Sequence, residues 1–440
     1  MSPEIISIVA LAAMFVVATL WPINMGALAF VAAFLVGTAV VALQPEDILA
    51  GFPGNLFLIL VGVTYLFGIA HTNGTVDLLI QGAVRLVGGR VAAIPWVMFF
   101  VTATLTAVGA LSPAAVAIVA PIALGFAARY HINTLLMGAM VVHGAQAGGF
   151  SPVSVYGGIV QGIVAGTGLP SSPMTVFVLS FIFNFAFAFV LYLLFGWRLL
   201  GQRVAAPATT QVPVTIAGRG GLSWGATAGG PLTTESGSTR SDLRFEQVAT
   251  SAGLILLMIL TVGFGFHLGF VAISIAVALA ILSPGAQKEA VNKISWPIVL
   301  LLGGVLTYVH VLQEAGTIDY LSDGVVAIGV PIFGALVLCY VAGLVTAFAS
   351  STAMLGVLIP LMVPFLLQGE VSAVAMVAAL AISVTMPDIS PFSTNGALVL
   401  ANARDPHPER FYRYLLGYTG LVIVVAPLVA WAVLIFPNWL

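Results

Sequence analysis

The sequence predicts an all-α protein that crosses a membrane many times and consists of two inverted-topology repeats. Three observations lead to this fold class. Hydrophobic residues make up 60% of the 440 residues and charged residues 6%, whereas about a quarter of the residues are charged in ordinary soluble domains. A polar pattern inside apolar segments occurs twice, and the basic residues fit one side of a two-repeat topology. The bilayer is therefore the expected solvent of this chain.

The repeated pattern covers residues 106–159 and returns 239 residues later without a gap. In the first copy Ser112-Pro113 lies between two apolar arms, and Gly148-Gly149 and Ser151-Pro152 interrupt a later hydrophobic run. The matching pairs are Ser112/Ser351, Ala114/Ala353, Pro121/Pro360, Met137/Met376, Ala139/Ala378, Ser151-Pro152/Ser390-Pro391, Ser154/Ser393 and Gly157/Gly396. Two copies of a unit with polar breaks inside apolar helices are typical of a secondary transporter.

Taken in order, the apolar segments predict three kinds of membrane element. Runs long enough to cross a core about 30 Å thick occupy about 4–22, 25–43, 55–72, 173–197, 247–266, 269–284, 297–312 and 414–436. Segments at about 134–165 and 372–403 contain Gly, Pro, Ser or Asp and are expected to be broken helices. Segments at about 93–128 and 332–367 are each divided by a short polar stretch, and each forms either two crossings or a re-entrant hairpin.

The basic residues favour two hairpins. Each half then has five spans, the second half is inverted, and all 13 Lys and Arg residues fall on the cytoplasmic side, as the positive-inside rule requires. Counting either hairpin as one crossing would divide the basic residues between the two faces. The expected organisation is a first repeat at 1–198, a flexible cytoplasmic linker at 199–245 and a second repeat at 246–440, with both termini periplasmic. The first span lacks a basic n-region and is expected to be retained.

The hairpin tips form the first candidate site. Ser112-Pro113 marks one tip, and Ser351-Thr352 marks the other. Two opposed tips would direct helix N-termini at a common midplane site, where N–H donors and partial positive charge suit a carboxylate. A serine at such a position can instead bond the backbone of its own helix.

The helix breaks form the second candidate site. Unwound carbonyl groups at such breaks are suitable Na⁺ ligands. Asp388, whose repeat mate is Gly149, is the one acidic residue expected at membrane depth, where it would bind Na⁺, carry a proton or cap the following half-helix. The candidate Na⁺ ligands at tips and breaks are Ser112, Gly148, Gly149, Ser154, Thr346, Ala349, Ser351, Asp388 and Ser393.

His143 and Gln146 precede the first break and lie three residues apart, which places them on one helix face. His143 either bonds substrate and moves protons or packs between helices. The candidate substrate-binding residues are Ser112, Pro113, Ser351, Thr352, Ser151, Pro152, Ser390, Pro391, Gln146 and His143.

These segments resemble the ion-transporter superfamily, in its divalent-anion/sodium symporter branch, and within it the bacterial dicarboxylate carriers of the MatC type. The likeness is strongest over NMGALAFVAAFLVG, GFPGNLFLILVGVTYLF, ALSPAAVAIVAPIALGF and HGAQAGGFSP. The resemblance implies a bacterial cytoplasmic-membrane protein, a homodimer, Na⁺ at tips and breaks, a dicarboxylate between the tips and an elevator movement. Serine stands at both tips where the family has asparagine, and Asp388 lies outside the family pattern.

The expected function is cation-coupled symport of a small dicarboxylate such as malonate or a C4-dicarboxylate, with Na⁺ or H⁺ as the coupling ion and no other cofactor. The alternative is a cation/proton antiporter that uses Asp388 and His143 as proton carriers. An enzyme is not expected, because the sequence has no Cys/His pair, metal motif or nucleophile elbow. A passive channel would not need inverted broken repeats.

Overall fold

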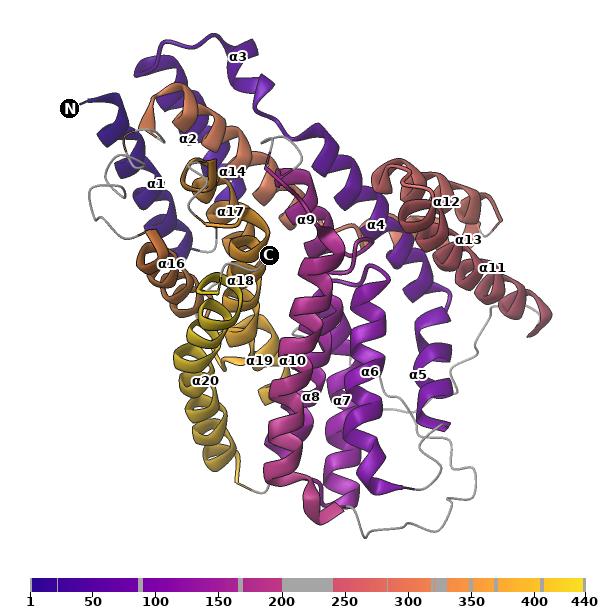
Figure 1. Cartoon of the computed structure of the whole chain (residues 1–440). Coiled ribbons are helices and arrows are strands. Elements are labelled where there is room, and N and C mark those ends of the chain that lie inside the picture. Colours follow the sequence, from indigo (N-terminus) through magenta and orange to yellow (C-terminus); the bar gives the residue numbers. More distant parts are fainter. Residues whose placement is uncertain are drawn as a thin grey trace, which may run out of the picture.

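The computed structural model describes residues 2–21, 23–85, 90–164, 169–199, 240–282, 284–317, 320, 331–347, 351–367, 371–403 and 407–437. Every element in these ranges is a helix (Figure 1), in agreement with the predicted all-α class. Seven of the described helices are long and apolar enough to cross a membrane. The chain is thus a multi-pass membrane protein.

The helices follow the predicted segments closely in both halves. In the first half they are α1 (Pro3–Leu20), α2 (Met25–Ala39), α3 (Pro45–Ala50), α4 (Gly54–Thr72), α5 (Thr75–Arg85), α6 (Ile94–Ala107), α7 (Ser112–Tyr130), α8 (Thr134–Gly148), α9 (Val155–Val164) and α10 (Pro173–Phe195). In the second half they are α11 (Arg240–Met258), α12 (Leu268–Leu282), α13 (Pro284–Asn292), α14 (Trp296–Glu314), α16 (Pro331–Thr346), α17 (Ser351–Leu367), α18 (Ala373–Thr385), α19 (Thr394–Asn402) and α20 (Pro408–Ala430). The expected linker at 199–245 lies mostly outside the described ranges.

Helix starts fall at equivalent positions in the two halves because equivalent polar residues stand there. The Asn133 side chain accepts from Leu136 N at the start of α8, and the Ser372 side chain accepts from Ala375 N at the start of α18. Such caps satisfy N–H groups that have no partner within the helix. Asn133 and Ser372 are separated by the same 239 residues as the sequence repeat.

The packing partners of the helices also recur between the halves. Helices α6, α7 and α8 contact one another, as do α16, α17 and α18. Helix α7 packs against α19 of the other half, and α17 packs reciprocally against α9. Outside this core, α2 packs on α14 and α12 packs on α4.

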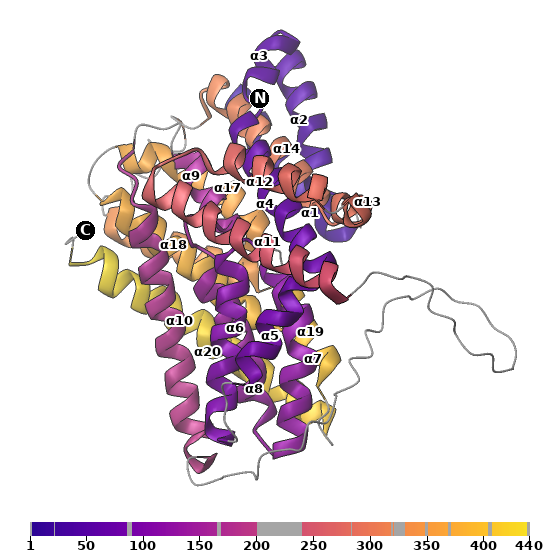
Figure 2. The same cartoon turned by 90° about the vertical axis from the view of Figure 1, so that its right-hand side faces the viewer.

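The two broken segments run in opposite directions. In both views of the fold, α9 lies above α8, whereas α18 lies above α19 (Figures 1 and 2). The chain therefore ascends through the first break and descends through the second.

Glycines allow two outer helix pairs to touch through their backbones. A Cβ on Gly304 of α14 would lie 1.9 Å from the carbonyl oxygen of Gly26 in α2. At the related crossing of α4 and α12, a Cβ on Gly62 would lie 2.9 Å from the carbonyl oxygen of Gly269. Small residues let helices approach closely in membranes, where packing rather than hydrophobicity drives association.

We expect Gly304→Ala to destabilise the fold. The added methyl group would meet backbone atoms that cannot move aside as a side chain can, and overpacking of this kind costs about 1–3 kcal/mol. The measurement is the thermal unfolding temperature of the purified protein in detergent. The matched control is Gly420→Ala in α20, where a Cβ meets nothing within 4 Å; equal unfolding temperatures for the two variants would contradict the backbone contact.

Candidate functional site

The two helix breaks share one hydrogen-bonded design. At the first break, the Ser154 hydroxyl donates to the carbonyl groups of Gly149 and Ser151, the latter at 2.6 Å, and accepts from Gly157 N at 3.1 Å. At the second break, the Ser393 hydroxyl donates to the carbonyl groups of Asp388 at 2.6 Å and Ser390 at 2.8 Å. These serines therefore close the turn and begin the next half-helix.

The remaining polar positions of the breaks also have local partners. The Ser151 hydroxyl accepts from Val153 N at 3.4 Å, and the Ser390 hydroxyl accepts from Phe392 N at 3.2 Å. Both are short side-chain-to-backbone turns of the kind serine favours.

The matched glycines in the first turns of α9 and α19 lie close to other backbone atoms. A Cβ on Gly157 would lie 2.0 Å from the carbonyl oxygen of Ser151, and a Cβ on Gly396 would lie 1.9 Å from that of Ser390. Gly148 is equally confined, since its Cβ would lie 1.9 Å from the carbonyl oxygen of Ala103. The glycines that mark the repeat are thus required by close packing of the broken ends.

Asp388 lies at the centre of a buried polar cluster that joins both halves. Its Oδ2 accepts from Gln146 Nε2 at 2.8 Å and from Asn395 Nδ2 at 2.9 Å. The same Asn395 amide donates to the Ser112 hydroxyl at 2.8 Å. Ser351 lies beside the carboxylate without a hydrogen bond to it. Ser351 of the second tip therefore lies beside the carboxylate, and Ser112 of the first tip is linked to it through Asn395.

Tyr156 completes the contact between the two tips. It lies in α9, is buried, and its phenol interacts with Ser112 of the first tip and Thr352 of the second. Since Ser112, Ser351 and Thr352 are all buried as well, the two tips approach each other inside the protein.

Three oxygen atoms of this cluster have no protein partner in the described part of the chain. They are Oε1 of Gln146, Oδ1 of Asn395 and Oγ of Ser351. The orientation of both amides is fixed, because each must direct its NH₂ group toward the carboxylate. Leaving a buried polar atom unpaired costs about 1–3 kcal/mol. A bound ligand that pairs with these oxygens would remove that cost, so they are candidate ligand-binding atoms.

The chemistry of the cluster suits a hard cation. In the ranges that the structure describes, the carboxylate of Asp388 has amide and hydroxyl neighbours and forms no contact with Lys or Arg. Carboxylate, amide and hydroxyl oxygens are preferred ligands of hard cations. Among the described residues, no three His, Cys, Asp or Glu side chains lie close enough to share a metal ion. The Asp388 cluster therefore provides neutral oxygen atoms and one carboxylate as cation ligands.

Other predicted site residues have different surroundings. The Thr346 hydroxyl donates to Ala342 O at 2.8 Å within its own helix, and the Pro152 carbonyl accepts from Gln161 Nε2 at 3.2 Å. Pro113 occupies the first turn of α7, where a missing N–H does no harm. Pro391 lies within the second break, before α19 begins, and Ala349 lies outside the described residues.

His143 has different hydrogen-bond partners from Gln146 and does not bond to the Asp388 cluster. Its Nδ1 lies 3.1 Å from Asn184 Oδ1, and its Nε2 lies 2.6 Å from the Tyr418 hydroxyl. Asn184 uses its NH₂ group to donate to Ser180 O at 2.9 Å, so its Oδ1 accepts from His143 Nδ1. Nε2 then accepts from Tyr418, and both ring nitrogens of a neutral histidine are satisfied.

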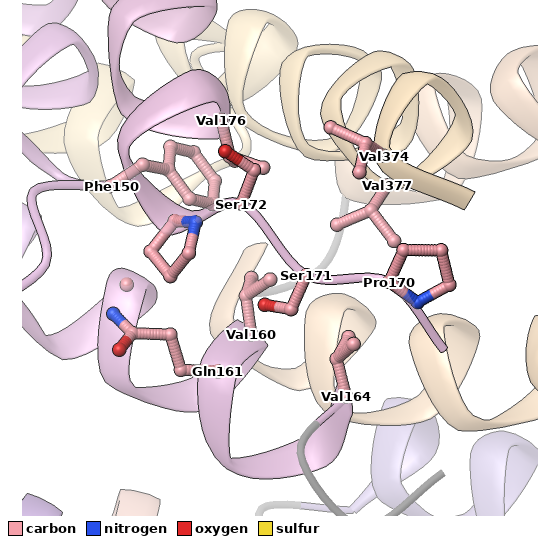
Figure 3. Close-up of a pocket in the computed structure, with 12 residues that line it drawn as sticks. Phe150, Val160, Gln161, Val164, Pro170, Ser171, Ser172, Val176, Val374 and Val377 are labelled. Carbon is pink, nitrogen blue, oxygen red and sulfur yellow. The ribbon is translucent and has the colours of Figure 1, made fainter. Parts of the chain in front are cut away.

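A small cavity beside the first break is separate from the polar cluster. It has a volume of about 20 Å³ and lies between α9, the segment leading into α10 and the start of α18, with Phe150, Gln161, Ser171 and Ser172 around it (Figure 3). This space is sufficient for one water molecule. None of the Asp388 cluster residues lines it.

Sequence reasoning did not assign Tyr156, Asn395, Asn184 or Tyr418 to a site. Tyr156 and Asn395 occupy equivalent positions, 239 residues apart, two residues after the matched Ser154 and Ser393. Continuing the repeat by two residues would have drawn attention to both. No sequence signal connects Asn184 or Tyr418 with His143.

Comparisons with known proteins agree with the fold. Residues 1–149 match the family described as dicarboxylate carrier protein MatC, N-terminus, which confirms the predicted resemblance over that part of the chain. No curated protein matches the sequence. Among solved structures, the chain is similar to the YdaH transporter of Alcanivorax borkumensis, reported to have an unusual topology. The TM-score is 0.60 with 15% identity, over 88% of this chain and 86% of that chain.

We expect His143→Phe to lower stability by about 1–3 kcal/mol, because Asn184 and the Tyr418 hydroxyl would lose a buried partner. Tyr418→Phe should then destabilise the His143→Phe variant much less than it destabilises the natural protein, as a double-mutant cycle of thermal unfolding would measure. The control is Tyr414→Phe on the same helix, whose exposed hydroxyl accepts from Arg410. Full additivity of His143→Phe and Tyr418→Phe would contradict the hydrogen bond.

Proposed function

We propose that this chain is a cation-coupled symporter of a small dicarboxylate such as malonate or a C4-dicarboxylate, with Na⁺ as the coupling ion. The observation that carries this proposal is the Asp388 cluster, where two hairpin tips and two helix breaks meet around a buried carboxylate with unpaired oxygens beside it. The family match supports a dicarboxylate as the substrate class. Both comparisons point to a transporter rather than an enzyme.

The cluster offers separate groups to the cation and to the anion. The Asp388 carboxylate, Gln146 Oε1 and Asn395 Oδ1 are the candidate cation ligands, and Ser351 of the second tip lies beside the carboxylate. Helices α7 and α17 begin at Ser112 and Ser351, so their N-termini and hydroxyl groups are available to a carboxylate. A bound cation would offset the negative charge of Asp388, and binding of cation and anion would then favour each other.

In this proposal the two inverted repeats supply two mechanical parts. The core comprises α6–α10 and α16–α20, which interleave across the halves, and it moves in an elevator manner against a scaffold of α1–α4 and α11–α14. The protein would work as a homodimer in the bacterial cytoplasmic membrane, with residues 199–245 in the cytoplasm and both termini in the periplasm.

The first test is uptake of labelled malonate and C4-dicarboxylates into proteoliposomes under imposed Na⁺ or H⁺ gradients. We expect concentrative uptake driven by the Na⁺ gradient, and we expect Asp388→Asn to abolish it while preserving the shape of the side chain. Asp77→Asn in α5, which removes a charge from an exposed position, should behave as the natural protein does. The coupling would be refuted if neither gradient changed the rate of dicarboxylate uptake, or if the Asp388→Asn variant accumulated substrate as the natural protein does.

A second test measures cation binding directly. Na⁺ should raise the thermal unfolding temperature relative to choline, because a ligand that binds only the folded state stabilises it. Gln146→Leu should remove this increase, whereas Gln161→Leu, which lies in α9 outside the cluster, should retain it. An equal Na⁺ response in both variants would remove Gln146 from the cation site.

The alternative function is cation/proton antiport with Asp388 and His143 as proton carriers. The geometry favours it less, since His143 is bonded to Asn184 and Tyr418 rather than to the Asp388 cluster. Proton movement driven by Na⁺ in proteoliposomes without any dicarboxylate would favour the antiporter over the symporter.

A further inference from the structure

A second cavity, of about 310 Å³, adjoins the tip of the first hairpin. It lies between α4, the start of α7 and the segment that joins α13 to α14. Its volume falls at the lower end of the range of small-molecule sites, which is about 300–1,000 Å³. The lining residues include Thr64, His71, Gly109, Leu111, Ala114 and Lys293.

Two polar groups of this cavity, the Lys293 ammonium and the His71 imidazole, can donate hydrogen bonds. The Lys293 ammonium donates to His71 Nδ1 at 2.8 Å and to the Thr72 hydroxyl at 3.0 Å. Because an ammonium group can only donate, Nδ1 accepts, and the ring proton of a neutral His71 resides on Nε2. A positive charge and an imidazole N–H in one pocket suit a carboxylate.

The ion pair between Lys293 and Glu289 is exposed and therefore weak. Glu289 Oε1 lies 3.0 Å from the ammonium, but the side chains are 64% and 30% exposed, respectively. Ion pairs at exposed positions contribute about 0–1 kcal/mol. A carboxylate that enters the cavity can therefore compete with Glu289 for Lys293.

The cavity and the Asp388 cluster share one turn of chain. Gly109, Leu111 and Ala114 line the cavity, whereas Ser112 in the same turn accepts from Asn395 in the cluster. Gly109 has a φ of +112°, and a Cβ there would lie 2.6 Å from Val63 Cγ1 of α4. The tip is thus pressed against α4, with the cavity and the cluster on its two sides.

We propose that this cavity is an access site on the cytoplasmic side of the hairpin tips, where Lys293 and His71 bind one carboxylate of the dicarboxylate as it passes between the tips and the cytoplasm. The inference rests on the proposed function and assigns to Lys293 a role in substrate capture. A purely structural Lys293, which ties α13 to α4, would affect stability and not substrate affinity.

The first measurement is the concentration dependence of malonate transport from the cytoplasmic face, in proteoliposomes that hold the protein with that face outward. Lys293→Gln should raise KM about tenfold or more, because hydrogen bonds to charged groups are strong, and should leave kcat unchanged. Lys293→Arg should restore most of the affinity. Lys288→Gln, an exposed position in α13 outside the cavity, should match the natural protein. An unchanged KM in Lys293→Gln, or a loss confined to unfolding temperature, overturns the access site.

The second measurement detects the anion without transport. Ala117, which lines the cavity on α7, is changed to cysteine in a Cys339→Ala background, and its reaction with a membrane-impermeant thiol reagent is followed with and without malonate. Malonate should slow labelling, and Lys293→Gln should abolish that protection. Absent or Lys293-independent protection overturns the access site. Protection without any uptake would contradict the proposed symport while retaining the anion site.

Discussion

The hydrogen bonds to the Asp388 carboxylate constrain much of the structure around them. A charged group at membrane depth needs partners inside the protein, and here they come from Gln146 near the end of α8 and Asn395 near the start of α19. Because Asn395 also donates to Ser112, the carboxylate fixes the position of the opposite hairpin tip. The serine caps of the breaks hold the backbone that makes these meetings geometrically possible.

The cluster is asymmetric although the fold around it repeats. Gly149 is the repeat mate of Asp388, and Tyr156 is the mate of Asn395, so one half brings an aromatic hydroxyl where the other brings an amide. Both mates still reach the same place, since Tyr156 lies against Ser112 and Thr352. The duplicated backbone thus supplies the enclosure, and the differences between its copies supply a single net charge on one side of it. A site made of two identical halves would carry either two carboxylates or none.

The sequence allowed the fold to be predicted further than the site. Apolar runs, Ser-Pro steps and the 239-residue offset placed nearly every helix, because a membrane span has a minimum length and a polar break inside it is conspicuous. The same signals identified Ser112, Ser351 and Asp388. They did not identify Tyr156 or Asn395 as their partners, or connect His143 with Tyr418, 275 residues away. Such contacts depend on how helices far apart in sequence are rotated against each other, which periodicity in one segment does not encode.

The glycine crossings have a consequence for movement within the membrane. Where the backbone of α14 lies against that of α2 at Gly26, no layer of side chains separates the two helices, and the α4–α12 crossing is similarly close. Side chains between two helices can change rotamer when the helices slide past each other. Backbone atoms in direct contact cannot adjust in this way. Each of these helix pairs is therefore expected to move as one rigid body. Movement of one helix relative to another must then occur at other interfaces, where long side chains form the contact.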